Sequence, residues 1–194
     1  DSSVPGRPAS ASPHHSNGAA AARHTRRTTM RLGNPDPPIR RAHKAIVDIR
    51  DIEAVLHKAL VVRIAMCDGD QPYIVPVNFA YHAQRLYIHS ARKGRKIDIL
   101  RANPKVCFET DVDIDVIEPA DPAKACDFGM RFRSVVGTGT VEIHEDLLTV
   151  AMGLDLLMAR FTDRTYEYPE AILHKTAMLV VKIDEVSGKQ AGMA

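Results

Sequence analysis

The sequence predicts a mainly β protein with flanking α-helices, folded as a small six-stranded antiparallel barrel. Six stretches rich in β-branched and aromatic residues lie between residues 60 and 188. The turns between the early stretches are short, as in β-hairpins, and helical periodicity is confined to three segments at the ends of strands. Short turns favour an antiparallel barrel over βαβ units.

The first ordered element is predicted to be a helix within residues 47–60. Its apolar residues recur with the i, i+3, i+4, i+7 spacing of one helix face. These residues are Ile52, Val55, Leu56 and Ala59. Asp48 or Asp51 can cap this helix, because a short carboxylate side chain accepts a hydrogen bond from a free N–H group of the first turn.

Six strands are predicted from alternating or β-rich segments. They cover residues 60–67, 72–81, 86–91, 105–112, 133–144 and 177–188. The sequence DGDQ at 68–71 is a hairpin signal between the first two strands. Pro72 and Pro76 exclude the second strand from a fully paired central position, since proline has no N–H group to donate to a neighbouring strand.

Two further helices are predicted in the second half of the barrel region. Residues 95–103 have a helical pattern that stops before Pro104, because the residue preceding a proline disfavours the α conformation. Residues 145–161 have the most extensive apolar helix face. Residues 113–131 show neither period and are predicted to be irregular.

Residues 1–38 are predicted to be a disordered N-terminal extension, and residues 39–194 a single domain. The extension holds six of the twelve prolines and almost no large apolar residues, so packing cannot offset the entropy of ordering it. Its arginine-rich, acid-poor composition also resembles an organelle transit peptide, which stays an alternative. Five arginines and one aspartate lie in residues 1–31, whereas the whole chain carries +2. The remaining body is not basic, so no nucleic-acid partner is expected.

The three cysteines, Cys67, Cys107 and Cys126, show neither disulfide-framework nor metal-ligand spacing. Free thiols favour a reducing compartment, so we expect a cytoplasmic protein without a metal site. Cys107 lies in a predicted strand and is expected to face the core, and Cys126 is expected to be an unreactive thiol.

No apolar run approaches 18 residues, so no membrane partner is expected. No apolar segment near the N-terminus indicates a secretory signal.

The stretch YIHSARKGRK, residues 87–96, gathers basic side chains where a strand ends and a helix begins. They are Arg92, Lys93, Arg95 and Lys96. The N–H groups and the dipole at a helix N-terminus attract an anion, Gly94 lets the backbone approach it, and Ser90 can add a hydroxyl donor. The residues alone leave two interpretations open, a phosphate site and a solvated basic turn.

Two neighbouring features can contact a ligand. His89 lies where the strand meets the turn, and is either a ligand-contacting group or a packed strand-end histidine. At Pro76, Val77 and Asn78 the proline leaves a gap in the hydrogen-bond ladder, which serves either a flat heterocycle or protection of an edge strand against aggregation. The glycines of RSVVGTGT lack G-x-G-x-x-G spacing and lie in a strand, so tight packing explains them and a dinucleotide fingerprint is excluded.

These motifs occur in an order that resembles a known family. P-Y-x-V-P-V-N-F-x-Y is followed by L-Y-I-H-S-A-x-x-G-R-K-I-D-I-L-R-x-N-P-x-V-C-F, then by a distal cysteine, R-S-V-V-G-x-G and a terminal S-G-K. The order is similar to that of the pyridoxamine 5′-phosphate oxidase-like FMN-binding split barrels, and most similar to the branch that contains the nitroimidazole-resistance (Nim) proteins. The resemblance covers about residues 40–190.

The resemblance implies a six-stranded split barrel and a homodimer with two FMN sites at its interface. The matched positions form four groups. They are Pro76, Val77 and Asn78 for the isoalloxazine ring; His89, Ser90 and Ala91 along the ring and ribityl chain; Gly94, Arg95 and Lys96 for the phosphate; and Ser134 and Val135 approaching the ring from the later strand of this chain or of its partner.

The resemblance also implies an FMN-dependent oxidoreductase that reduces a small electron-poor substrate such as a nitroimidazole or another nitroaromatic. His89 matches the histidine associated with reductase function in Nim-type proteins, as proton donor or substrate contact. The alternatives are a non-catalytic flavin-binding dimer and a split barrel that binds haem or a deazaflavin. Pyridoxamine phosphate oxidation itself is not expected, because the chain ends soon after DEVSGKQ, before the further substrate-phosphate residues of those enzymes.

Overall fold

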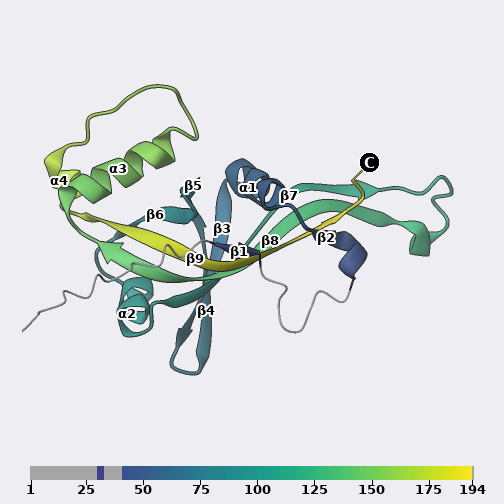
Figure 1. The fold of residues 1–194 in the computed structure, drawn as a ribbon, viewed down its shortest axis with the longest axis horizontal. Helices are drawn as coiled ribbons and strands as arrows, with labels where there is room; N and C mark the ends of the chain where they lie inside the picture. Colours follow the sequence, from purple (N-terminus) through teal and green to yellow (C-terminus); the bar gives the residue numbers. More distant parts are fainter. Residues whose placement is uncertain (1–29, 33–40, 194) are drawn as a thin grey trace, which may run out of the picture.

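The computed structural model describes residues 30–32 and 41–193, which form one almost entirely antiparallel sheet curled into a barrel (Figure 1). Seven strands follow in the order β4-β3-β7-β8-β9-β6-β5, and β1 and β2 pair with β9. The bounds are β1 Arg31–Leu32, β2 Ala45–Ile46, β3 Val61–Asp68, β4 Gln71–Asn78, β5 Ala80–His82, β6 Arg85–Ala91, β7 Lys105–Ile117, β8 Gly129–His144 and β9 Thr176–Ala191. The predicted mainly β, antiparallel class is confirmed, with more strands than the six predicted.

The predicted strand 72–81 is in fact two strands, β4 and β5, separated at Phe79. The Phe79 side chain is buried in the core, so the chain bends where this ring turns inward. β4 pairs with β3 along one edge, and in the described ranges no strand pairs with its other edge. The expectation that Pro72 and Pro76 keep this segment out of a central position is therefore confirmed.

The prediction of an irregular segment at 113–131 is wrong at both ends. β7 continues to Ile117 and β8 begins at Gly129, and the two extensions pair with each other. They project from the body as a long hairpin, residues 113–131, which we call the arm (Figure 1). Most of its side chains are exposed, so the sequence lacks the apolar alternation of a half-buried strand. Cross-strand pairs such as Asp115 Oδ2 and Arg131 Nη2, 2.6 Å apart, stabilise the hairpin instead.

The barrel is open between β4 and β6, which lie side by side without a shared ladder in the described part of the chain. We call this opening the seam. β5 pairs with β6 only at 85–87, so from Ile88 onward β6 has a strand partner on one edge alone. Behind the seam the apolar core is tightly packed, with a cavity of only about 10 Å³ bordered by Val77, Ile88 and Lys96.

Three helices match the three predicted ones. They are α1 (Ile49–Lys58), α2 (Arg95–Ala102) and α3 (Leu147–Met158). Asp48 caps α1 by accepting from Arg50 N at 2.9 Å, and Asp146 caps α3 by accepting from Thr149 N at 2.8 Å. Each cap satisfies an N–H group that has no partner inside its helix. α3 lies against β5, β6 and β9. The short helices are η1 (Ala42–Lys44), η2 (Ala125–Asp127) and α4 (Glu170–Leu173).

Strand alternation decides which side chains of β7 and β8 face the core. Val106, Phe108 and Thr110 are buried, so Cys107 between them is exposed, and the prediction that Cys107 belongs to the core is wrong. The predicted tight packing of the β8 glycines is confirmed, because an added Cβ at Gly137 would lie 2.3 Å from Phe108 Cζ.

The predicted disordered extension, residues 1–38, lies outside the described residues except at 30–32. At these three residues Met30 N donates to Gln84 Oε1 at 3.0 Å and β1 pairs with β9 in parallel. Disorder of the extension stays a prediction. In the described ranges no helix is both long and apolar enough to cross a membrane. The same ranges hold no group of three or more His, Cys, Asp or Glu side chains placed to bind a metal ion.

Candidate functional site

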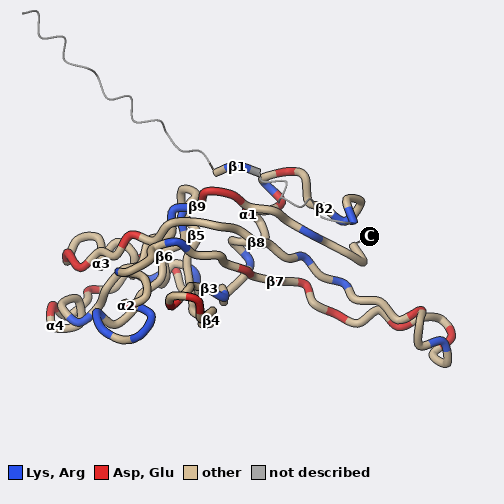
Figure 2. The backbone as a smooth tube through the Cα atoms, turned by 90° about the horizontal axis from the view of Figure 1, so that it is seen from below, with Lys and Arg blue, Asp and Glu red and all other residues tan. Residues whose placement is uncertain are grey.

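The turn between β6 and α2 has the backbone geometry of an anion site. Gly94 caps α2 with φ 121° and ψ 165°, a conformation essentially restricted to glycine. The first N–H groups of α2 have no partner within the helix and point out of its N-terminus. An added Cβ at Gly94 would meet no atom within 4 Å, so the approach to these groups is open. Figure 2 shows the basic residues gathered at this turn, in blue beside α2.

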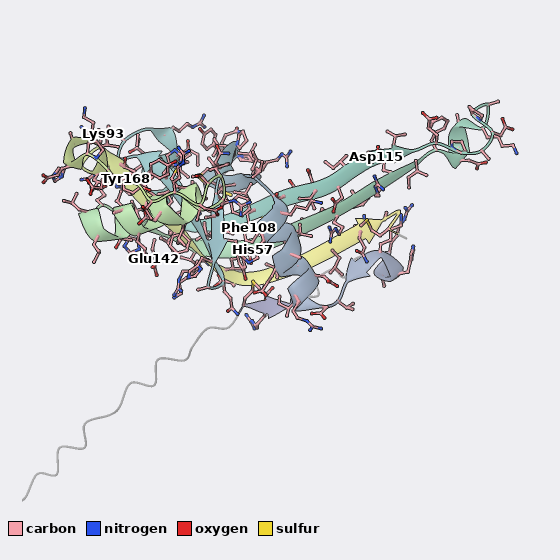
Figure 3. All side chains as sticks on the ribbon, turned by 90° about the horizontal axis from the view of Figure 1, so that it is seen from above. His57, Lys93, Phe108, Asp115, Glu142 and Tyr168 are labelled. Carbon is pink, nitrogen blue, oxygen red and sulfur yellow. The ribbon has the colours of Figure 1, made fainter. Side chains whose placement is uncertain are left out.

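The basic side chains of this turn have different surroundings. Arg92 is half-buried, and its guanidinium donates to the backbone carbonyls of Glu145 at 2.7 Å, Thr176 at 3.1 Å and Leu173 at 3.2 Å. Lys93 is exposed at the edge of the molecule (Figure 3). Arg92 therefore joins the turn to the segments that flank α3 and α4, and is a structural residue rather than a ligand contact.

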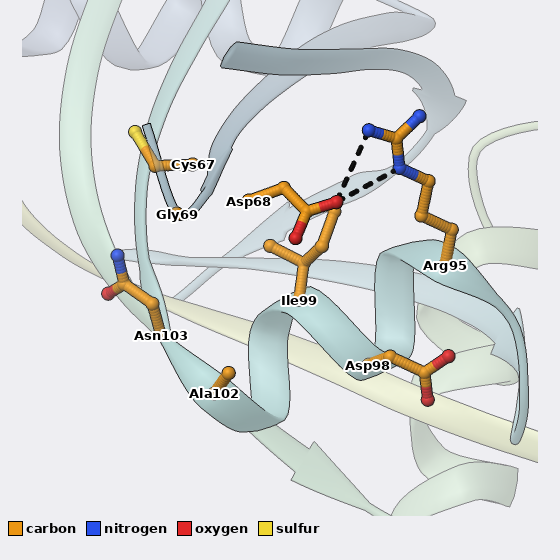
Figure 4. A pocket seen from close by; sticks show the side chains of 8 residues that line it. All are labelled: Cys67, Asp68, Gly69, Arg95, Asp98, Ile99, Ala102 and Asn103. Atoms are coloured by element: carbon orange, nitrogen blue, oxygen red, sulfur yellow. Dashed lines mark hydrogen bonds and ion pairs between the residues drawn. The ribbon is translucent and has the colours of Figure 1, made fainter. Parts of the chain in front are cut away.

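Arg95 is tied to the β3–β4 hairpin. Its Nε and Nη2 atoms both lie 3.2 Å from Asp68 Oδ2 (Figure 4), and its Cζ lies 4.5 Å from the centre of the Tyr73 ring. An open cavity of about 630 Å³ separates residues 67–69 of this hairpin from the face of α2 that runs from Arg95 to Asn103. Because a carboxylate already partners Arg95, a phosphate would have to displace Asp68 or share the guanidinium with it.

Lys96 differs from the other basic residues of the turn, because it is neither exposed like Lys93 nor paired like Arg92 and Arg95. It is half-buried, and among the described residues its ammonium has no hydrogen-bond or ion-pair partner. Its side chain borders the apolar core behind the seam together with Val77 and Ile88. Burial lowers the pKa of the Lys96 ammonium below its usual value, because apolar surroundings disfavour the charged form. An anion bound at the N-terminus of α2 would offset this cost.

The residues predicted to line a ring lie on the edge strand β4. Pro76 and Asn78 are exposed, and Val77 between them points inward. The Asn78 side chain is held in place, because its Nδ2 atom donates to the Leu60 carbonyl at 3.3 Å. Since one edge of β4 carries no strand in the described residues, a flat ligand can lie against it.

The predicted residues of β6 lie where β5 no longer covers this strand. His89 and Ala91 are exposed, Ser90 is half-buried, and all three pair with β9 on the far edge. The fold thus brings Val77 of β4, the end of β6 and Lys96 of α2 to the seam, although these segments are separate in the sequence.

Ser134 and Val135 do not join this group within one chain. They lie on β8 between β7 and β9, which separates them from both strands of the seam. Ser134 is half-buried, whereas the Val135 side chain is fully buried in the core and is not available to a ligand on the surface. A contribution of Ser134, or of the Val135 backbone, to a site at the seam stays a prediction and would require a second copy of the chain.

Sequence reasoning missed Arg160, which follows α3. Its Nη2 atom donates to the Ala59 carbonyl, and its Cζ lies 5.4 Å from the centre of the Phe79 ring, next to Asn78 in the chain. Burial lowers the pKa of this guanidinium. No local pattern marks Arg160, because its surroundings come from α1 and from the β4–β5 junction, which are distant in the sequence.

A family model shows the family to which the chain belongs. The family model described as pyridoxamine 5′-phosphate oxidase matches residues 48–190. A curated relative, an uncharacterised protein of Rhizobium meliloti, is 39% identical over 64 residues, which is 33% of this chain and 42% of that relative. The chain thus spans less than half of the length of that relative.

Solved structures agree with this fold. A protein described as a 5-nitroimidazole antibiotic resistance protein from Bacteroides thetaiotaomicron is 29% identical with a TM-score of 0.67, over 75% of this chain and 85% of that one. An FAD-binding protein from Mesorhizobium loti is 27% identical with a TM-score of 0.55, over 75% and 96% of the two chains. The flavocytochrome Anf3 from Azotobacter vinelandii, 21% identical with a TM-score of 0.71 over 84% and 77%, shares the fold. The chain therefore belongs to the pyridoxamine 5′-phosphate oxidase family and has its split-barrel fold, and it is similar to a structure described as a 5-nitroimidazole antibiotic resistance protein.

Proposed function

We propose that the chain is an FMN-binding oxidoreductase that reduces a small electron-poor substrate, such as a nitroimidazole or another nitroaromatic. The observation that carries this proposal is Lys96, a half-buried cation without an acidic partner in the described residues, beside an open helix N-terminus and the seam. Membership of the family and the likeness to a 5-nitroimidazole resistance protein support the proposal.

The residues at the turn fit a phosphate monoester. The N–H groups at the start of α2 and the Lys96 ammonium would bind the phosphate, Gly94 would leave it room, and the Ser90 hydroxyl would add a donor. Arg95 would contribute only by moving away from Asp68 or by sharing that pair. Lys96 and the backbone are therefore assigned the main part of phosphate binding.

The ring would lie at the seam against β4. Pro76, Val77 and Asn78 would line it, with His89 and Ala91 at the opposite strand. When bound, FMN would supply the electron transfer, and the protein would hold and orient it. His89 is exposed beyond the end of β5, so its imidazole is accessible to a substrate and is assigned the role of proton donor or substrate contact.

A homodimer would complete this site. The arm carries exposed apolar side chains that a monomer would leave in water: Ile114 at 58%, Val116 at 55%, Ile117 at 41%, Phe128 at 44% and Met130 at 48% exposed. A second copy that covers them could also bring its Ser134 to the ring. Light scattering on purified protein should therefore give twice the chain mass, and a monomeric mass for the flavin-loaded protein would contradict this part of the proposal.

Three exposed free thiols, Cys67, Cys107 and Cys126, support a reducing, cytoplasmic location.

The cofactor assignment is tested by comparing FMN with riboflavin, which lacks the phosphate. Lys96→Ala should weaken FMN binding about 10- to 100-fold, because one charge-assisted hydrogen bond contributes about 1.5–3 kcal/mol. Riboflavin affinity should hardly change, and Lys93→Ala, which removes an exposed neighbouring cation, should leave both affinities unchanged. Equal losses for FMN and riboflavin would instead show that Lys96 acts through folding.

The visible spectrum of the purified protein and an anaerobic assay test the remaining alternatives. A flavin spectrum supports the proposal, a Soret band supports the haem-binding alternative, and a colourless protein that does not bind added FMN would overturn the assignment.

With FMN bound, oxidation of a reduced nicotinamide in the presence of a nitroimidazole is expected, and His89→Gln should slow it. Absence of turnover with a panel of electron donors and acceptors would favour a non-catalytic flavin-binding dimer.

A further inference from the structure

Arg160 is a half-buried cation just past α3, and within the described protein only one of its nitrogen atoms has a hydrogen-bond acceptor. A guanidinium carries five N–H donors. Arg160 uses one of its groups, Nη2, to reach the Ala59 carbonyl, and its buried Nε atom has no partner. In the part of the chain that the structure describes, no carboxylate lies within ion-pair distance of this side chain. Its charge is therefore not neutralised locally.

A structural explanation accounts for part of this arrangement. Ala59 is the C-cap of α1, and the carbonyls at a helix C-terminus attract a cation. The Phe79 ring provides a further favourable surface for a guanidinium. Yet one carbonyl and one ring leave the buried Nε atom without an acceptor, and an unsatisfied buried donor costs free energy. The Nε atom itself is buried, but the charge of the guanidinium can act on a ligand at a distance.

The position of Arg160 relates it to the edge of β4. Arg160 and Asn78 donate to consecutive carbonyls of one segment, Ala59 and Leu60 respectively. Phe79, over which Arg160 lies, directly follows Asn78. The guanidinium therefore lies beside the end of β4 that the proposed function assigns to the flavin ring.

We propose that Arg160 supplies the positive charge that stabilises the reduced form of a flavin bound at this end of β4. This inference rests on the proposed function. Uptake of a hydride, two electrons and one proton, from a reduced nicotinamide leaves one extra negative charge on the ring system and oxidises the nicotinamide. A nearby cation that no carboxylate neutralises favours that charged product, since it interacts more strongly with the reduced ligand than with the neutral oxidised ring. Arg160 would thereby raise the reduction potential of the bound flavin.

The test measures the reduction potential of FMN bound to the full chain. Arg160→Gln should reduce the affinity for reduced FMN relative to oxidised FMN about tenfold, which lowers the midpoint potential by about 30 mV for a two-electron couple. Arg160→Lys, which keeps the charge, should retain most of the wild-type potential. Arg101→Gln removes an equal charge from an exposed ion pair with Glu145 and should not change the potential.

A second variant covers the case in which Arg160→Gln does not fold. Phe161 is 57% exposed, so Phe161→Glu adds a negative charge beside Arg160 with little disturbance of the core, and should lower the potential, whereas the neutral Phe161→Gln should not. Failure of the wild-type chain to bind FMN would reject the proposed function itself. If FMN binds, and neither the loss of charge at Arg160 nor the added charge at Phe161 moves the potential, only the role of Arg160 is rejected.

Discussion

The basic turn before α2 and the segment just past α3 each hold a half-buried cation without an acidic partner in the described residues, Lys96 and Arg160. Burial lowers the pKa of both groups. The two regions differ in their sequences, because Lys96 belongs to a cluster of four basic residues, whereas Arg160 follows an apolar helix. A high local density of charge therefore does not identify a binding residue. The roles proposed for Lys96 and Arg160 rest instead on the unbalanced charge of each side chain in its folded surroundings.

The turn itself contains the same contrast. Arg92 and Lys96 are four residues apart, yet Arg92 donates to three backbone carbonyls and Lys96 has no such partner in the described residues. Arg160 lies between these extremes, with one carbonyl partner and one unsatisfied nitrogen. Substitutions that separate structural cations from available ones therefore test the comparison directly.

The largest effect is expected for Arg92→Ala, which should lower the free energy of unfolding by about 3 kcal/mol. It removes three hydrogen bonds to partly buried carbonyls, each contributing about 1 kcal/mol. Lys93→Ala is the matched control and should change stability by less than about 0.5 kcal/mol, because its side chain is exposed. Urea unfolding of both variants measures the difference. Similar losses in the two would mean that Arg92 is no more structural than its neighbour.

Gly94→Ala should lower the free energy of unfolding by about 1–3 kcal/mol, because a side chain disfavours φ 121° with ψ 165°. The added methyl group would meet no atom within 4 Å, so the loss would come from the backbone alone. Gly129→Ala serves as the control, since its Cβ would be at an ordinary 3.6 Å from Ile117 Cβ. Equal thermal stability of the two variants, with FMN affinity intact, would contradict the role assigned to the Gly94 conformation.

The smallest effect concerns the pH dependence of stability that Lys96 contributes. The pKa of Lys96 is lower in the folded than in the unfolded chain. Between the folded pKa and the unfolded value of 10.5, the unfolded chain therefore binds more protons than the folded chain. The burial penalty is fully present below the folded pKa and is relieved as the pH rises toward 10.5. Lys96→Met should therefore be more stable than the wild type at pH 7, by less than about 1 kcal/mol because solvent screens a half-buried charge.

The advantage of Lys96→Met should shrink between neutral pH and about pH 10, where the wild-type lysine loses its proton more easily in the folded state. Chemical unfolding of both proteins without flavin at the two pH values gives the comparison. An advantage that stays constant or grows with pH would mean that burial does not destabilise the charge on Lys96. Lys105→Met, at an exposed position, should show no such change with pH.

Sequence patterns were sufficient where a local cause determines the structure. The apolar spacing and the Asp48 cap predicted α1, and Pro72 and Pro76 predicted an edge strand, because these effects act within a few residues. The arm was missed because its two strands stabilise each other without a buried face. Cys107 was assigned to the core because a strand pattern specifies alternation but not which face is buried.

The candidate site divides in the same way. The order of motifs was enough to expect a split barrel and to point to Gly94 and Lys96, since a glycine turn before a helix is encoded in one continuous stretch. Only the tertiary structure decided that Arg92 is bound by carbonyls, that Arg95 is paired with Asp68, and that Val135 is buried. It also brought Arg160 beside the end of β4. The physical reason is that the sequence specifies which side chains carry charge, whereas contacts between distant segments determine which of those charges are compensated.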